Sequence, residues 1–178
     1  MTANTAFQPR VWNNRNNDTQ NIAGRYYSGV RAADCSSGWL CQRGEIDENG
    51  VSRMTAAGAG TDPAYACNPS DVRRLTAPDG NVYAVGRSTL GLGIPAGVTD
   101  TFTELIPGEI YSFGEGNFLD PPESGQTWFK MSGGQLTVSA SQPAEGIYFE
   151  LCSNLGSEVF TEGCWGTVPQ YTVICRRA

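Results

Sequence analysis

Apolar and polar residues alternate in short stretches along this chain, and turn signals separate the stretches. Side chains two residues apart lie on the same face of a strand, so Ile147, Phe149 and Leu151 are predicted to share one face. The same reasoning predicts strands at 45–47, 51–54, 75–76, 82–85, 101–105, 109–113, 128–131, 136–140, 147–152 and 171–175 (which places Tyr171, Val173 and Cys175 on one face).

Turn residues lie between many of these stretches. Glu48-Asn49-Gly50, Pro78–Asn81, Pro107-Gly108 and Ser132-Gly133-Gly134 are typical of tight turns. No segment keeps a helical period over a dozen residues, and one short helix is predicted at 71–75, capped by Ser70. Residues 55–70 and 89–97 are predicted loops. We therefore expect an all-β fold, an antiparallel β-sandwich or barrel with at most one short helix.

The first 28 residues differ from the rest of the chain. They are rich in Asn and poor in aliphatic side chains, so they are predicted to form an extended N-terminal arm, with a β-rich domain at 29–178. A polar arm is ordered only when something holds it in place; we expect a partner chain, and packing on its own domain is the alternative. Its candidate partner-binding residues are aromatic anchors and arginines, namely Phe7, Arg10, Trp12, Arg15, Arg25, Tyr26 and Tyr27.

Composition limits the chemistry. The 178 residues include no His, which excludes Ser-His-Asp triads, Cys-His dyads and His proton shuttles within the chain. The formal net charge is -6. Residues 1–89 hold nine Arg against eight acidic residues, whereas residues 90–178 hold three basic residues against ten acidic ones. This charge repels phosphate backbones, so nucleic acid is not an expected partner.

Neither a membrane nor a cofactor is expected. No stretch approaches the ~20 apolar residues of a membrane span. The start of the chain has neither the basic region nor the apolar run of a secretory signal. Gly91–Gly97 lacks the spacing and the following helix of a nucleotide-binding loop, and Asp47–Gly50 lacks the distal Glu of a calcium loop. We interpret both as connections between strands.

The six cysteines are Cys35, Cys41, Cys67, Cys152, Cys164 and Cys175. None forms a Cys-x-x-Cys pair, so a zinc site is not expected, and the even count allows up to three disulfides. Cys35–Cys41, which closes a short Ser-Ser-Gly-Trp-Leu loop, is the most plausible local pair. Cys152 with Cys164 or Cys175 is a second candidate. Buried reduced thiols are the alternative for a protein made in a reducing compartment.

The sequence also holds candidate residues for glycoside hydrolysis and for Schiff-base chemistry. The carboxylate pairs Asp120–Glu123 and Glu145–Glu150 are the local candidates for glycoside hydrolysis, although acidic β-proteins offer such pairs by chance. Lys130 alternates with Phe129 and Met131, which places it on the solvent face of a strand rather than in an apolar pocket that would favour a Schiff base.

Tryptophan offers a binding chemistry instead. Trp12, Trp39 and Trp165 lie in loop-like contexts, and Trp128 is predicted to be in the core. Exposed tryptophans stack on sugar rings or anchor interfaces. A glycan-binding β-sandwich of a tail fibre or surface protein is therefore the alternative function.

Residues 93–119 carry a sequence resemblance. They run Ile-Pro-Ala-Gly-Val-Thr, then an alternating Thr-Phe-Thr-Glu-Leu stretch, then Pro-Gly-Glu-Ile-Tyr-Ser-Phe-Gly. This stretch, about a sixth of the chain, resembles the small β-rich decoration, or cement, proteins of tailed-bacteriophage capsids. The six cysteines are a departure from that group, many of whose members have few.

The resemblance implies a non-enzymatic virion structural protein. Such a protein is made in the host cytoplasm and binds the capsid exterior, at local three-fold or two-fold positions, as a trimer or dimer. Its partners are the major capsid protein and copies of itself. The group offers no catalytic, metal or cofactor residues to carry over to this chain.

Overall fold

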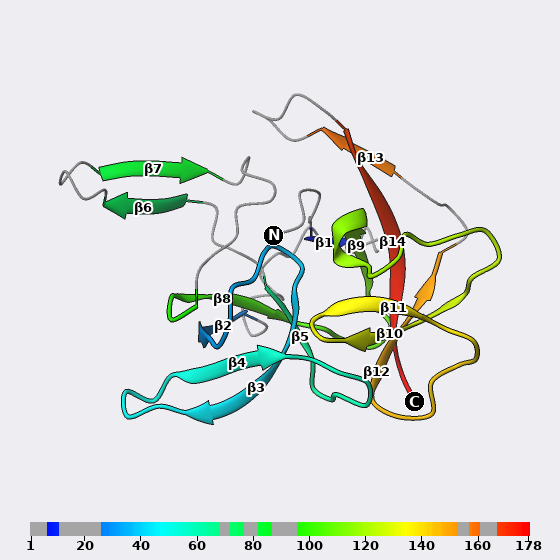
Figure 1. The fold of residues 1–178 in the computed structure, drawn as a ribbon, viewed down its shortest axis with the longest axis horizontal. Helices are drawn as coiled ribbons and strands as arrows, with labels where there is room; N and C mark the ends of the chain where they lie inside the picture. The colour runs from blue at the N-terminus through cyan, green and yellow to red at the C-terminus, as the bar shows by residue number, and fades with distance from the viewer. Residues whose placement is uncertain are drawn as a thin grey trace.

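The computed structural model describes residues 7–10, 26–67, 72–76, 82–86, 96–152, 157–160 and 167–178. These residues form a closed β-barrel and a larger curled sheet side by side, with a separate hairpin beyond the barrel (Figure 1). The expected all-β fold class is confirmed.

Five strands close the barrel in the order β2-β4-β3-β5-β8. They are β2 (Tyr26–Arg31), β4 (Ser52–Ala56), β3 (Leu40–Ile46), β5 (Tyr65–Cys67) and β8 (Thr99–Glu104). Four of the pairings are antiparallel, as expected, and β2 with β4 is parallel. Closure leaves no unpaired edge in this part of the molecule.

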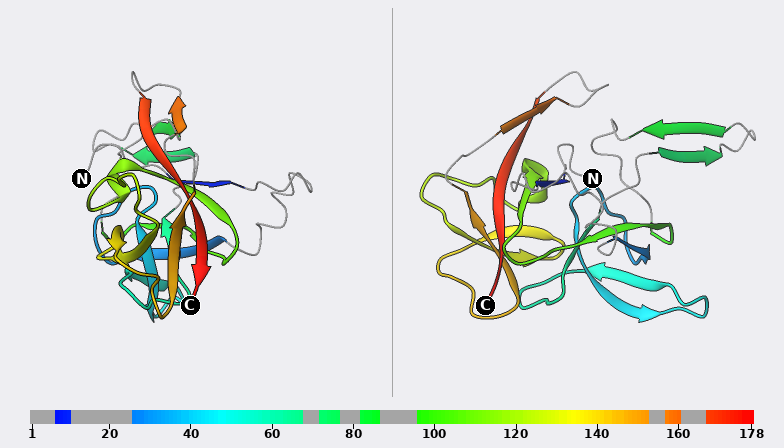
Figure 2. Two further views of the ribbon diagram at one scale, coloured as in Figure 1. Left: turned by 90° about the vertical axis from the view of Figure 1, so that its right-hand side faces the viewer. Right: turned by 180° about the vertical axis from the view of Figure 1, so that it is seen from behind.

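The sheet runs β1-β9-β14-β12-β10-β11, and β13 pairs with one end of β14. Its strands are β1 (Phe7–Arg10), β9 (Ile110–Gly114), β14 (Thr167–Arg177), β12 (Ile147–Leu151), β10 (Trp128–Ser132), β11 (Gln135–Ser139) and β13 (Ser157–Phe160). β14 is the longest strand and extends past the sheet to meet β13 (Figure 2).

Alternation along the strands divides the buried side chains into two cores. Leu40 and Ala66 project from the barrel into a core shared with the sheet, where Phe113, Phe129 and Phe149 pack. The predicted shared faces of β12 and β14 are confirmed, because their residues lie in or against this core. The neighbours Cys41, Tyr65 and Cys67 face the opposite way, into the barrel.

The predicted turns are confirmed where the structure describes them. The backbone N–H groups of Asn49 and Val51 both donate to the Asp47 carboxylate, and Gly50 has φ +78°. Gly133 and Gly134 both have positive φ and join β10 to β11 as a two-residue hairpin loop.

Two local expectations were wrong. The segment predicted as a short helix is strand β6 (Val72–Thr76), which pairs along its length with β7 (Val82–Gly86). Five residues gain little from a helix alone, whereas a partner strand satisfies the backbone of the whole segment. The predicted loop at 55–70 contains β5. Within the described residues, helical structure is confined to the 3-10 turn η2 (Glu115–Asn117), and no helix has the length and apolar character to cross a membrane.

The segment predicted as an arm contributes two strands. Residues 7–10 form β1, which pairs with β9 of the same chain, and β2 begins at Tyr26. Residues 1–6 and 11–25 lie outside the described residues. The arm as an independent unit therefore stays a prediction, and its described pieces belong to the sheet and to the barrel.

Candidate functional site: a thiol cluster in the barrel

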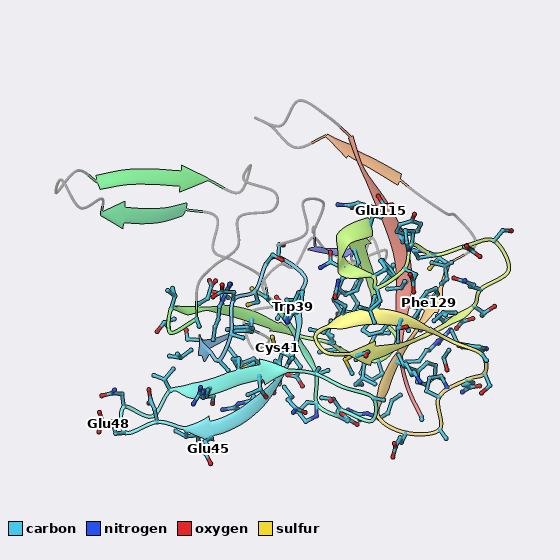
Figure 3. The ribbon with its side chains drawn as sticks, in the orientation of Figure 1. Trp39, Cys41, Glu45, Glu48, Glu115 and Phe129 are labelled. Carbon is cyan, nitrogen blue, oxygen red and sulfur yellow. The ribbon has the colours of Figure 1, made fainter. Side chains whose placement is uncertain are left out.

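Three thiols meet at one end of the barrel interior. Cys41 pairs with Tyr65 across β3 and β5, and the Cys67 N–H donates to the Trp39 carbonyl at 2.8 Å. Cys41 and Cys67 therefore lie diagonally on the same inward face. Cys35 belongs to the loop after β2 and is buried in the same cluster as Cys41 and Cys67. Figure 3 shows Trp39 and Cys41 where the barrel meets the sheet.

A buried ion pair borders the thiols. Arg31 and Asp100 have side chains only 1% and 3% exposed and form a salt bridge. Arg31 also donates to the Cys67 sulfur at 2.6 Å and to the Cys35 carbonyl at 2.9 Å. Its guanidinium lies 5.9 Å from the centre of the Phe102 ring. This arrangement fixes a cation at the centre of the cluster, because each contact orients the same planar group.

The cluster favours one thiolate, on Cys35. Hydrogen bonds from Cys41 and Cys67, assisted by the nearby Arg31, lower the pKa of Cys35 to about 4 even though burial opposes ionisation. The pKa of Cys41 is raised, chiefly because its thiol donates to Cys35. Burial and the contact with Cys35 raise the pKa of Cys67. A single negative charge is therefore held among three sulfurs.

A thiolate beside two thiols is suited to oxidation and disulfide formation. Cys35, Cys41 and Cys67 are all reduced in the structure. Among the described residues, no group of three or more Cys, Asp or Glu side chains has the arrangement of a metal site. The arrangement thus offers a nucleophile and resolving thiols. Cys35 and Cys41, predicted from sequence as a disulfide pair, both belong to it, and their pairing stays a prediction.

The opposite end of the barrel interior is polar and aromatic. Tyr27 donates to the Glu104 carboxylate at 3.0 Å and packs edge-on against Tyr65, with ring centres 5.2 Å apart. Arg43 lies over the Tyr27 ring at 5.5 Å. The bond to Glu104 raises the pKa of Tyr27. We call Tyr27, Arg43, Tyr65 and Glu104 the tyrosine end of the barrel.

The structure describes four of the seven predicted partner-binding residues, and three of those four only by their backbone pairing. Phe7 and Arg10 are at the two ends of β1, opposite Phe113 and Ile110, and Tyr26 is opposite Thr103 in the barrel. Tyr27 is half-buried at the tyrosine end. Trp12, Arg15 and Arg25 lie outside the described residues. The proposed role of all seven in partner binding stays a prediction.

Of the C-terminal cysteines, the structure describes Cys152 and Cys175, which are not joined to each other. Cys152 is half-buried and Cys175 is fully buried in the core shared with the sheet, and both are reduced. Burial raises the pKa of Cys175 to about 12, so that thiol is a poor nucleophile. Cys164 lies outside the described residues, so its pairing with Cys152 stays a prediction.

The other candidate residues are mostly exposed or paired. Asp120 and Glu123 are exposed, and Glu150 accepts from Arg176 at 2.9 Å. Lys130 is on the solvent face of β10, as predicted. Trp39 is half-buried against the thiol cluster, and Trp128 is half-buried edge-on to Tyr148.

Comparisons with models of protein families, with curated proteins and with solved structures found no match to this chain. The residues that build the thiol cluster are therefore interpreted from their own geometry.

Sequence reasoning missed three members of the cluster. Arg31, Cys67 and Asp100 lie in different strands and come together only when the barrel closes, since Arg31 and Asp100 are 69 residues apart. One signal was available, because Asp100 is two residues before the apolar Phe102, and side chains two apart share a face of a strand. Nothing local identified Arg31 as its partner.

Proposed function

We propose that this protein is a non-enzymatic virion structural protein that binds the outside of an assembled phage capsid and stabilises it. The resemblance of residues 93–119 to decoration proteins supports the proposal. The described part of that stretch carries β8 and β9, one strand of the barrel and one of the sheet. It therefore connects the two halves of the body rather than lying in a peripheral loop.

The observation that carries the proposal is the pairing of β1 with β9. Within the described residues β1 is the outermost strand at its end of the sheet, and residues 11–25 separate it from β2. A terminal strand added to a sheet edge is a contact that forms equally well between subunits, by β-strand addition or exchange. Fifteen extended residues span at most about 50 Å, which is enough to reach a neighbouring subunit.

Charge and multiplicity support the same role. The N-terminal half supplies nine of the eleven arginines, whereas the C-terminal half is strongly acidic. Arginine pairs with carboxylates at interfaces, so the N-terminal segment is suited to an acidic surface of a shell subunit. Several modest contacts in each oligomer would then add up to firm attachment through avidity.

The test uses empty expanded capsids assembled from the major capsid protein encoded with this chain. Wild type is compared with a variant lacking residues 1–25 and a matched variant lacking residues 1–6, which keeps β1. We expect wild type and the shorter deletion to occupy the shell, and the longer deletion to bind about tenfold or more weakly. Failure of wild type to bind would overturn the proposed function, and full occupancy without residues 1–25 would overturn the role of the segment.

Glycan binding is a second candidate function, favoured by the tyrosine end of the barrel. A half-buried Tyr27 beside Glu104 and an exposed Arg43 combines a stacking ring with hydrogen-bonding groups, which is the usual chemistry of sugar recognition. A glycan array probed with wild type and Tyr27→Ala tests it. Specific signals lost in the variant would support this function, and an array without signals would remove it.

A further inference from the structure

The thiol cluster has a geometry that capsid binding does not use. Cys35, Cys41 and Cys67 lie in one buried cluster, and Arg31 donates both to the Cys35 carbonyl and to the Cys67 sulfur. The β3–β5 register fixes Cys41 and Cys67 on one inward face. The cluster therefore presents one sulfur with two potential disulfide partners, which are held by backbone pairing rather than by flexible loops.

The two partners differ in how tightly they are held. The Cys67 side chain is fully buried and accepts a hydrogen bond from Arg31 at 2.6 Å. Besides its packing against Cys35, the Cys41 sulfur makes a long contact of 3.6 Å to the Trp39 carbonyl. Moving Cys67 would break its bond with Arg31 inside the barrel, whereas moving Cys41 would lose little. Cys41 is thus the sulfur more readily brought onto Cys35.

Cys35 lies close to the protein surface. The residue is 6% exposed, and its chain neighbours Ala33 and Asp34 are exposed. The cluster therefore lies directly beneath the surface of the loop that follows β2. A small neutral oxidant reaches a thiol just below the surface more readily than a bulky peptide disulfide does.

We propose that Cys35 and Cys41 form an oxidative cross-link site that reacts with hydrogen peroxide. The Cys35 thiolate attacks one peroxide oxygen, the O–O bond breaks, and hydroxide leaves, giving Cys35 sulfenic acid. The Cys41 sulfur then attacks the Cys35 sulfur, and the sulfenic oxygen leaves as water after taking a proton. Overall, two thiols and one peroxide give one disulfide and two waters. Cys67 stays reduced beside Arg31.

Peptide mapping reads the result directly. Trypsin cleaves after Arg31, Arg43, Arg53 and Arg73, so Cys35 and Cys41 share peptide 32–43, whereas Cys67 lies in peptide 54–73. After peroxide treatment of the full chain and non-reducing digestion, we expect peptide 32–43 to be lighter by two hydrogen atoms and peptide 54–73 to be unlinked. A cross-link between the two peptides, or an unchanged peptide 32–43, would overturn the proposal.

Two variants test the roles of the sulfurs. In Cys41→Ser the sulfenic acid on Cys35 has lost the resolving thiol that we assign to it, so we expect it to be captured by dimedone. Absence of both the adduct and a Cys35–Cys67 disulfide would overturn the assignment of Cys35 as the attacking sulfur. Cys175→Ser is the matched control, because Cys175 is a deeply buried thiol in the other core. This variant should form the Cys35–Cys41 disulfide as wild type does. If Cys41→Ser does not fold, Cys41→Ala serves the same purpose. None of these assays involves a capsid, so their outcome is independent of the proposed function.

Discussion

Arg31 and Asp100 form an ion pair inside the barrel, with both side chains almost completely shielded from solvent. Removing one partner of a buried pair leaves an uncompensated charge, which costs far more than the pair itself contributes. We predict that Asp100→Asn lowers the free energy of unfolding by about 3 kcal/mol or more, measured by urea denaturation.

A surface pair provides the control for that measurement. Arg177 and Asp62 form a salt bridge with side chains 54% and 30% exposed. Exposed pairs contribute about 0–1 kcal/mol, so Asp62→Asn should change stability little. Equal losses of unfolding free energy in Asp100→Asn and Asp62→Asn would contradict the larger loss expected at the buried ion pair.

Gly134 holds the sheet against the barrel, and only glycine fits there. Its N–H donates to the Ala57 carbonyl at 3.0 Å, and its carbonyl accepts from the Leu40 N–H at 2.8 Å. Its φ is +87°, and a methyl group at this position would overlap the Trp39 indole. We predict that Gly134→Ala destabilises the protein by more than about 2 kcal/mol, because left-handed strain and steric overlap add together.

Gly133→Ala is the matched control for Gly134→Ala. Gly133 also has positive φ, but nothing lies within 4 Å of a Cβ placed there. The control should therefore show the backbone strain alone, about 1–2 kcal/mol. Thermal unfolding of both variants measures the difference, and similar losses would argue against the close contact with Trp39.

The local parts of this fold were predictable from sequence. The β10–β11 hairpin could be predicted from two glycines between alternating stretches, because the turn and both of its strands lie within about a dozen consecutive residues. The segment at 71–75 shows the opposite case. Ser70 and Asp71 look like a helix start, but pairing of β6 with β7 outweighs that local preference.

The non-local parts were not predictable in the same way. Two strand pairings are examples: β2 pairs with β4 in parallel, and β1 pairs with β9. In both cases, neither sequence segment contains a feature that identifies its partner. The thiol cluster depends on both kinds of information. Cys35 and Cys41 are close in sequence and could be singled out as a pair, whereas Arg31, Cys67 and Asp100 join them only through barrel closure.

Pairing of β1 with β9 predicts a specific hydrogen-exchange pattern. Deleting residues 1–10 removes the partner of one edge of β9, while β14 continues to cover the other edge. We expect amides within 110–113 that face β1 to exchange about tenfold or more faster, and those that face β14 to change little. A variant lacking residues 1–6 keeps β1 and should exchange like wild type. Unchanged exchange after the longer deletion would mean that β1 does not occupy this edge in the isolated chain.

The Cys35 thiolate predicts an unusual pH dependence of stability. Its folded-state pKa of about 4 is far below that of an unfolded thiol, about 8.5, so the folded state binds fewer protons between these values. Stability should therefore rise with pH across that window, by up to about 1.4 kcal/mol per pH unit. Above it the trend reverses, because Cys41 and Cys67, whose pKa values are raised, ionise first in the unfolded state. The chain has no His, so the background is nearly flat between about pH 5.5 and about pH 8, which lies below the unfolded thiol pKa. Urea denaturation under reducing conditions should show the slope in wild type and its loss in Cys35→Ser, which retains the α-amino group and every carboxylate. The same slope in both proteins would exclude a thiolate at Cys35.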